Sequence, residues 1–174
     1  MDISFGKPEK ELLNLMSLFT SSIGLGEAAG RVLGALMLAG VPLSQKEISE
    51  LTEYSPSIVS ICLSKLENWG IVRRVGRAGK RKLYATTSTL LDIIEVFFSN
   101  IIDKQLSFLT EFIQDHIDSF NEDTKKNAMK ILNETRKSRH VLRLTVMLIE
   151  KLKSLAPREL LKLFNSFKEK LSSL

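Results

Sequence analysis

The chain has 174 residues, which is enough for one domain with a good core or for a small domain with a helical extension. A single cysteine, Cys62, excludes an intrachain disulfide framework, and the first residues lack the pattern of a secretion signal, so we expect a cytoplasmic protein. The longest uncharged apolar run, 32–43, is shorter than the ~20 residues of a membrane span, and the net charge of +5 permits a polyanionic partner.

Two helices are predicted at the start of the chain. Pro8 suits the first turn of a helix, and apolar residues then repeat at helical spacing as far as Gly24, a residue that ends helices. We assign residues 1–23 to an N-terminal helix that serves dimerisation. Residues 26–39 predict a second, mostly apolar helix, in which Gly30 would allow close helix packing.

Two capped helices follow. Ser44 is typical of a helix N-cap, and Glu47 stands at the capping-box position. Ser55 followed by Pro56 is a second cap, and it opens a helix that ends at Trp69. Helices joined by so short a turn predict a helix-turn-helix.

The pattern then changes to that of strands. Residues 71–75 and 83–87 are short β-prone runs on either side of a glycine-containing loop, which predicts a β-hairpin. A hairpin directly after a helix-turn-helix is a wing, so residues 24–87 predict a winged helix-turn-helix DNA-binding domain. The wing holds the densest positive charge of the chain and no acidic residue; its basic residues are Arg73, Arg74, Arg77, Lys80, Arg81 and Lys82.

Residues 88–174 are expected to be helical throughout. Between 91 and 120 the apolar residues keep a three-or-four spacing, which predicts one helix roughly 45 to 50 Å long. A second apolar row, which includes Phe108 and Phe112, widens the apolar face beyond what one packing partner covers, so we expect a second chain to bury it. The polar run 133–140 is either a solvated face or a break. The expected fold class is therefore mainly α with a small β-hairpin wing, followed by long C-terminal dimerisation helices.

A short signature joins the predicted recognition helix to the wing, and it consists of Glu67, Trp69, Gly70, Ile71, Val72, Arg73 and Arg74. Through it, residues 24–87 resemble the winged-helix region of MarR-type regulators, and most of all the GbsR-like branch. The resemblance implies a homodimer with two recognition helices and two wings and, where such a regulator has one, a small-molecule effector, whose identity no motif here reveals. Such wings often carry an Asp-Arg pair where this chain has Lys80-Arg81, which removes an internal ion pair and raises the positive charge.

Candidate DNA-binding residues lie on the recognition helix and on the wing. On the helix, residues away from the core stripe could contact base edges or phosphates, or could form an ordinary solvated face. The wing cations need only to reach a phosphate, although Arg73 or Arg74 could instead pair with Glu67. The candidates are Ser55, Ser57, Ser60, Ile61, Ser64, Lys65, Arg73, Arg77, Lys80, Arg81 and Lys82.

Other features of the sequence favour plain structural roles. Cys62 lies beside the core stripe and is interpreted as a small buried hydrophobe rather than a redox sensor. His116 and His140 stand alone, without the spacing of a zinc site. No catalytic constellation is visible, so we expect no enzyme activity, no cofactor and no bound metal.

The sequence thus predicts a sequence-specific, double-stranded DNA-binding transcriptional regulator. It would act as a cytoplasmic homodimer on a pseudo-palindromic operator. The alternative is a winged-helix protein-interaction module with no specific DNA target. Salt-dependent binding to duplex DNA distinguishes the two hypotheses.

Overall fold

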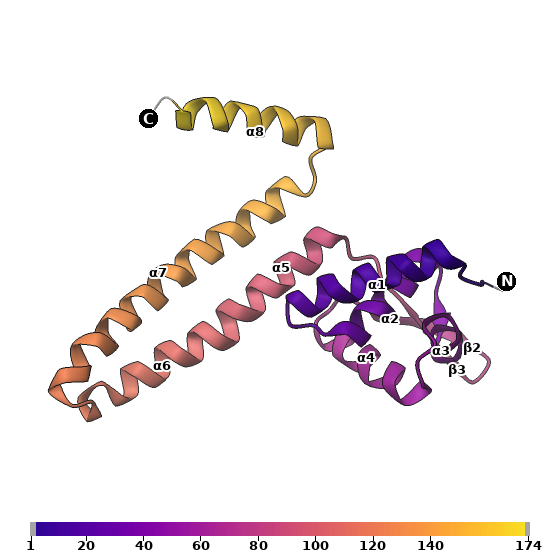
Figure 1. Cartoon of the computed structure of the whole chain (residues 1–174), viewed down its shortest axis with the longest axis horizontal. Helices are drawn as coiled ribbons and strands as arrows, with labels where there is room; N and C mark the ends of the chain where they lie inside the picture. The colour runs from indigo at the N-terminus through magenta and orange to yellow at the C-terminus, as the bar shows by residue number, and fades with distance from the viewer. Residues whose placement is uncertain (1–2, 173–174) are drawn as a thin grey trace. The chain divides into compact units, whose positions relative to one another are not determined.

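The computed structural model describes residues 3–172, which divide into two compact units, one that extends to Asp92 and one that begins at Ile93 (Figure 1). Residues 1–2 and 173–174, the ends of the two predicted dimerisation segments, lie outside the described residues. The chain is mainly helical with one small antiparallel sheet, which confirms the predicted fold class. No helix within the described residues is long and apolar enough to cross a membrane.

In the first unit, α1 (Lys7–Ser22) packs closely against α2 (Glu27–Ala39). The contact is closest at Gly30, where an added Cβ would lie 1.9 Å from Thr20 Oγ1 and 2.6 Å from the Met16 carbonyl oxygen. The buried Thr20 hydroxyl satisfies its own polarity by donating a hydrogen bond to that carbonyl at 2.9 Å. The predicted close packing at Gly30 is therefore confirmed.

The helix-turn-helix consists of α3 (Gln45–Thr52) and α4 (Pro56–Asn68), and both helices contact α2. Their apolar stripes meet those of α2 in a core whose fully or almost fully buried side chains are Val32, Leu33, Leu36, Ile48, Val59, Leu63 and Leu66. The helical spacing of these residues explains why α3 and α4 each bury one face and expose the other. α2 lies between them and α1 and is buried on most sides, from Ala29 to Leu36.

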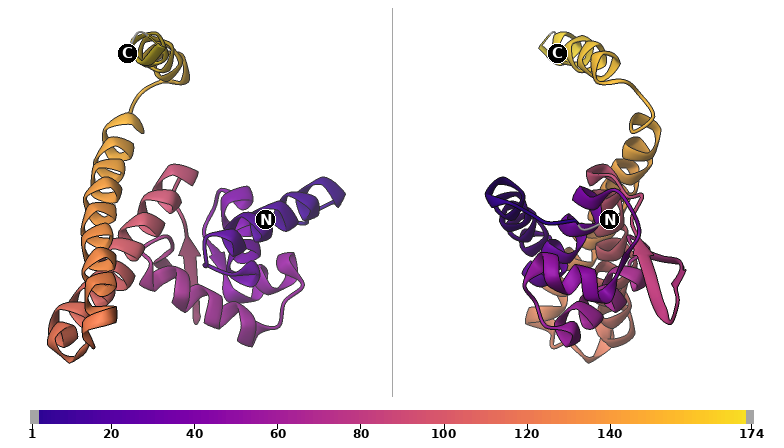
Figure 2. Two further views of the ribbon diagram at one scale, coloured as in Figure 1. Left: turned by 60° about the vertical axis from the view of Figure 1, so that its left-hand side comes forward. Right: turned by 90° about the vertical axis from the view of Figure 1, so that its right-hand side faces the viewer.

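A three-stranded antiparallel sheet in the order β1-β3-β2 completes the unit, and its strands are β1 (Leu43–Ser44), β2 (Arg73–Ala78) and β3 (Arg81–Ala85). The β2–β3 hairpin projects from the helices of this unit (Figure 2). Ala78 pairs with Arg81, so the turn contains only two residues, the first being Gly79 at a φ of 60°. Such two-residue turns favour residues that tolerate positive φ.

The wing is confirmed, but its predicted strand limits are wrong. Residues 76–78 and 81–82, predicted as loop, extend the two strands, and a register shift between Arg74 and Gly76 marks a β-bulge. The bulge accommodates one extra residue in β2, so Gly76 and the residues after it remain paired with β3. The strand β1 was not predicted, because two residues give no detectable alternation.

The second unit is helical, and its elements are most of α5 (Leu90–Asn100), a π-helical segment (Ile101–Leu106), α6 (Ser107–His116), a short 3-10 turn (Ile117–Ser119), α7 (Glu122–Leu152) and α8 (Pro157–Ser172). The single α-helix predicted over residues 91–120 is therefore interrupted. The hydroxyl of Ser107, the first residue of α6, donates a hydrogen bond to the carbonyl of Ile102 in the π-helical segment, five residues back, at 3.1 Å. The wider π-helical turn adds one residue and so rotates the apolar face of the residues that follow. A search for apolar residues three or four positions apart does not detect such a rotation.

α6 and α7 lie side by side within this unit (Figure 1). Ile113 from α6 packs with Ala128 and Leu132 from α7, and Ile117 and Phe120 close the end of this small core. The run 133–140 is continuous helix, so it is not a break, and most of its side chains are exposed.

We expect Gly30→Ala to destabilise the protein by about 1 to 3 kcal/mol, because the new methyl group overlaps backbone atoms of α1 that have no room to move. Alanine's higher helix propensity offsets this by at most about 1 kcal/mol. Urea denaturation measures the change. The control is Gly76→Ala, where an added Cβ meets nothing within 4 Å. Equal stability of the two variants would contradict the close α1–α2 contact.

Candidate nucleic-acid interface

The exposed face of α4 is set by its caps and its core stripe. The Ser55 hydroxyl accepts a hydrogen bond from the Ile58 N–H at 3.3 Å, Pro56 occupies the first turn, and the half-buried Trp69 is the C-cap residue. With the apolar stripe turned inward, the outward side chains are Ser57, Ser60, Ile61 and Ser64. Ile61 is 70% exposed and Ile58 is 40% exposed, so this face also carries apolar surface.

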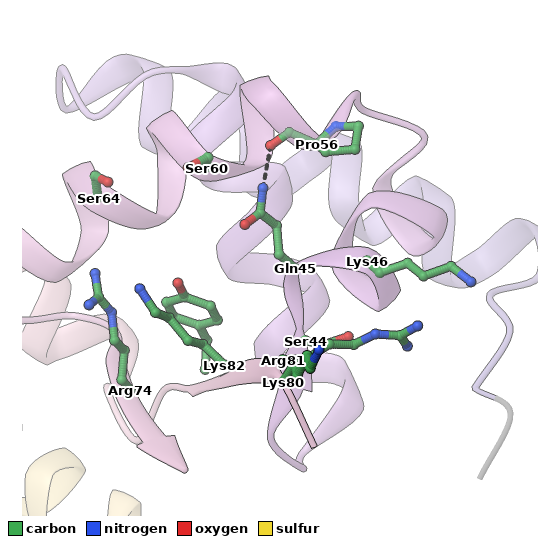
Figure 3. A pocket seen from close by; sticks show the side chains of 11 residues that line it. Ser44, Gln45, Lys46, Pro56, Ser60, Ser64, Arg74, Lys80, Arg81 and Lys82 are labelled. Atoms are coloured by element: carbon green, nitrogen blue, oxygen red, sulfur yellow. Dashed lines mark hydrogen bonds between the residues drawn. The ribbon is translucent and has the colours of Figure 1, made fainter. Parts of the chain in front are cut away.

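The N-terminus of α3 is fixed beside the N-terminus of α4. Ser44 and Glu47 form the predicted capping box, with the Ser44 N–H donating to a Glu47 carboxylate oxygen at 2.7 Å. The pKa of Glu47 is lowered, first by the Ser44 side chain and then by this backbone N–H. Gln45 Nε2 donates to the Pro56 carbonyl at 2.6 Å, which ties the two helix starts together (Figure 3).

The base of the wing is clamped to the end of α4. Two nitrogens of the Arg74 guanidinium bind the Glu67 carboxylate at 2.8 and 2.9 Å, and the same group lies 5.9 Å from the centre of the Tyr84 ring. The hydrogen bond to Glu67 is the main cause that raises the pKa of Arg74. The predicted alternative, in which one of the two arginines pairs with Glu67, is confirmed for Arg74. The bidentate geometry fixes the direction of the hairpin relative to α4.

Between α4 and the wing lies a groove of about 490 Å³. Figure 3 shows Ser60 and Ser64 on one wall and Arg74 and Lys82 on the other. The groove is lined by Ser44, Gln45, Lys46, Pro56, Ser60, Ser64, Arg74, Lys80, Arg81, Lys82 and Tyr84. None of these lining residues is acidic, but two of the cations are paired with carboxylates from outside the lining, Arg74 with Glu67 and Lys46 with Glu50. The groove therefore presents hydroxyl groups and the positive charge of Lys80, Arg81 and Lys82.

The structure brings together five of the predicted site residues, which are Ser60, Ser64, Lys80, Arg81 and Lys82. Ser57 and Ile61 are exposed on α4 outside the groove, and Arg73 and Arg77 are exposed on β2. Ser55 serves as the cap of α4.

Lys65 is turned away from the groove. Its ammonium donates to the Leu25 carbonyl at 2.6 Å and to the Gly24 carbonyl at 3.4 Å, so it ties α4 to the turn between α1 and α2. The contact of Lys65 with DNA stays a prediction, but its ammonium already binds backbone carbonyls within the first unit.

Sequence reasoning did not select Gln45, Lys46 and Tyr84 as part of this surface. Gln45 and Lys46 follow directly after the Ser44 cap, in the first turn of the helix that precedes the recognition helix. That position was the signal by which they could have been selected. Tyr84 gave none, because its place under Arg74 depends on the strand register.

The remaining chemistry of the chain is structural. Burial raises the pKa of the Cys62 thiol, although Lys65 acts in the opposite direction, so at neutral pH the thiol stays protonated and packs as a core side chain. Among the described residues, no cluster of three or more His, Cys, Asp or Glu side chains could hold a metal ion.

Comparison with known proteins agrees with this geometry. Residues 28–76 match the IclR helix-turn-helix domain. No curated protein matches the sequence. A crystal structure described as that of a transcriptional regulator is similar to the chain, with 14% sequence identity and a TM-score of 0.65 over 83% of this chain and 99% of that one.

Two further solved structures share less of the fold. MepR, a transcription regulator of the Staphylococcus aureus multidrug efflux pump MepA, has 20% identity and a TM-score of 0.39 over 75% of this chain and 90% of its own. Lactococcus lactis ZitR, a zinc-responsive MarR family member, has 18% identity and a TM-score of 0.32 over 65% of this chain and 75% of its own.

The fold of the chain is thus that of a winged helix-turn-helix with a helical extension, as found in a solved transcriptional regulator.

We expect Lys65→Met to lower the free energy of unfolding by about 1 kcal/mol, because it removes two hydrogen bonds to the carbonyls of Gly24 and Leu25. The matched control is Lys46→Met, since Lys46 forms only an exposed ion pair with Glu50 and its removal should change stability by less than about 0.5 kcal/mol. Thermal denaturation of both variants checks this. Equal stability of the two would show that the link from α4 to the α1–α2 turn is not formed in solution.

Proposed function

We propose that the chain is a sequence-specific regulator of transcription that binds double-stranded DNA as a homodimer, in the manner of the MarR-type proteins and their GbsR-like branch. In this proposal residues 24–87 bind DNA, and residues 1–23 and 88–174 hold the dimer. The protein acts in the cytoplasm. Each recognition helix α4 enters a major groove, and the twofold axis requires a pseudo-palindromic operator with half-sites roughly 34 Å apart or a multiple of that.

The observation that carries the proposal is the groove between α4 and the wing. Its α4 wall offers small hydroxyl groups that can approach base edges, and its wing wall offers guanidinium and ammonium groups. Cations without a carboxylate between them repel one another, and phosphates relieve that repulsion. We assign base contacts to Ser57, Ser60, Ile61 and Ser64, and backbone contacts to Arg73, Arg77, Lys80, Arg81 and Lys82.

Exposed apolar side chains support the dimer. In the second unit, Phe108 is 70% exposed and Phe112 is 48% exposed, and both lie on α6. In the first unit, the outer face of α1 exposes Leu12, Leu15 and Leu18. Apolar surface of this extent on one chain favours an obligate dimer that buries more than ~2,000 Å² in total.

A small-molecule effector could occupy an apolar hollow of about 250 Å³ in the first unit. The hollow is lined by Leu12, Met16, Gly34, Met37, Leu38 and Leu90. Its lining favours a small apolar molecule over a charged one.

The proposal predicts that Lys80→Ala together with Arg81→Ala weakens DNA binding by removing cations that bind phosphates. If both side chains of each protomer neutralise a phosphate, the double variant frees about four phosphates per dimer, and the slope of log affinity against log salt becomes shallower by roughly 3 to 4. Binding of purified protein to fluorescent duplexes across a salt series measures the slope. An unchanged slope would favour the protein-interaction module instead.

Ser60→Ala and Ser64→Ala are the matched controls from the opposite wall of the groove. Each should leave the salt slope almost unchanged, because neither side chain carries a charge. Each should instead alter the preference at particular base pairs, by ~1 to 3 kcal/mol where the hydroxyl made a good hydrogen bond to a base. Selection of bound duplexes from a random pool provides the specific site for this comparison.

The dimer proposal predicts that Phe108→Asp yields a folded monomer with weakened DNA binding. Phe108 is exposed in the single chain, so the charge should not disturb the protomer, whereas in an interface it would be buried without a partner. Ile61→Asp is the matched control, because Ile61 is equally exposed but lies on α4, and the dimer should persist. Sedimentation decides the matter; a wild-type monomer at micromolar concentration would refute the palindromic site as well.

A further inference from the structure

The polar run that the sequence left open belongs to a strongly basic stretch of α7. Residues 125–143 contain seven lysines and arginines and one acidic residue, Glu134, for a net charge of +6. Residues 73–82 of the wing also carry +6, so all other residues of the chain together carry −7. Positive charge is therefore concentrated in two places, and only one of them belongs to the groove.

The basic side chains of α7 gather on one face, called here the α7 basic face, and it consists of Lys126, Lys130, Arg136, Lys137 and Arg143. At 100° per residue, these positions fall within an arc of about 140°. All five are exposed, and none of them forms an ion pair with another described residue. On the same helical projection, the centre of the arc lies about 120° from the centre of the buried stripe that packs α7 onto its own unit, which consists of Ala128, Leu132 and Thr135.

This arrangement is unfavourable for an ordinary solvated helix face. Lys126 and Lys130 are four residues apart, and Arg136 and Arg143 are two turns apart on one side, so like charges neighbour each other along the helix. A solvated face usually alternates the sign of its charges and gains from i,i+4 pairs. Glu122 stands four residues before Lys126 and Glu134 four after Lys130, but neither forms an ion pair with them, and Arg136, Lys137 and Arg143 have no acidic residue four positions away. A polyanion would supply the missing partners.

Duplex DNA fits this face better than a membrane surface does. A membrane-bound helix sets an exposed apolar face opposite its basic face, but here much of the opposite side is buried within the unit. Most of the exposed apolar residues of α7 lie beyond the basic face along the axis, namely Leu144, Met147 and Leu148, with Val141 at its end. Within the length of the face, Met129 (42% exposed) lies among the basic residues and Ile131 (51% exposed) lies opposite them, and one apolar residue does not make a continuous apolar face. From Lys126 to Arg143 the face spans about 26 Å, and duplex DNA presents about one negative charge per 1.7 Å of its axis.

We propose that the α7 basic face is a second, sequence-independent contact for duplex DNA. It rests on the proposed function and extends it, because the contact is made by the helical extension and not by the recognition helix or the wing. It adds affinity for any sequence. In this proposal its side chains contact phosphates, which carry no sequence information.

The test is the full-length triple variant Arg136→Gln, Lys137→Gln and Arg143→Gln, which neutralises the face with residues that favour helices. Binding to a random-sequence duplex is measured across a salt series. The slope of log affinity against log salt should become shallower by about 0.9 for each phosphate that the variant no longer neutralises, hence by about 2 or more, and affinity at 0.1 M salt should fall at least about tenfold. Circular dichroism verifies that the variant is folded.

Two controls isolate the effect. The variant Lys7→Gln, Lys104→Gln and Lys162→Gln removes the same charge from exposed sites on other elements, and its slope should change by less than about 1. The variant Arg136→Lys and Arg143→Lys keeps the charge of the face and should keep the wild-type slope.

The wing variant Lys80→Ala, Arg81→Ala is measured in parallel, so that the two proposals can fail separately. If the wing variant flattens the slope and the α7 variant does not, the further inference is overturned and the proposed function stands. If neither changes the slope, both are overturned. Vesicles with anionic lipid test the other polyanion: binding that the α7 variant abolishes, with an unchanged DNA slope, would assign the face to a membrane surface and overturn the DNA contact.

Discussion

The close approach of α1 to α2 at Gly30 is the constraint on which the rest of the first unit depends. Because α2 contributes no side chain at Gly30, α1 packs directly on its backbone there and lies within reach of both ends of the helix-turn-helix. Lys10 binds Glu53 at 2.6 Å in the turn between α3 and α4, where Glu53 has a φ of 62°. At the other end of α1, the carbonyls of Gly24 and Leu25 receive the Lys65 ammonium from α4. Lys65 thus ties α4 to the α1–α2 turn, and the exposed Lys10–Glu53 pair joins α1 to the α3–α4 turn. A larger residue at position 30 would disturb both contacts.

The two units differ in how their charged and apolar side chains are used. In the first, the charged side chains that have partners act as clamps, as Arg74 does with Glu67, and other cations crowd the wing around the groove. In the second, a small apolar core around Ile113 and Leu132 leaves long helices with much exposed apolar and basic surface. A helical extension of this kind has more surface than its own core requires, which is typical of elements that bind other macromolecules.

The parts of the fold that depend on local interactions could be predicted from the sequence, and those that depend on register could not. The capping box of Ser44 and Glu47 spans three residues, so its pattern was readable and its geometry followed. The bulge in β2 and the π-helical segment each add one residue to a period, and nothing in the composition marks where that residue lies. Within the candidate site, the wing cations were evident as a charge run. The use of Lys65 was not, because its carbonyl partners lie about forty residues earlier in the chain.

The place of Trp69 has a practical consequence. It is the only tryptophan of the chain, it is half-buried, and it caps α4 two residues after the carboxylate that holds Arg74 of the wing. The indole therefore stands at the joint between the recognition helix and the hairpin. Its fluorescence carries no background from other indoles, so a change in emission reports a change at that joint directly. The unmodified protein thus carries an intrinsic fluorophore where α4 joins the wing.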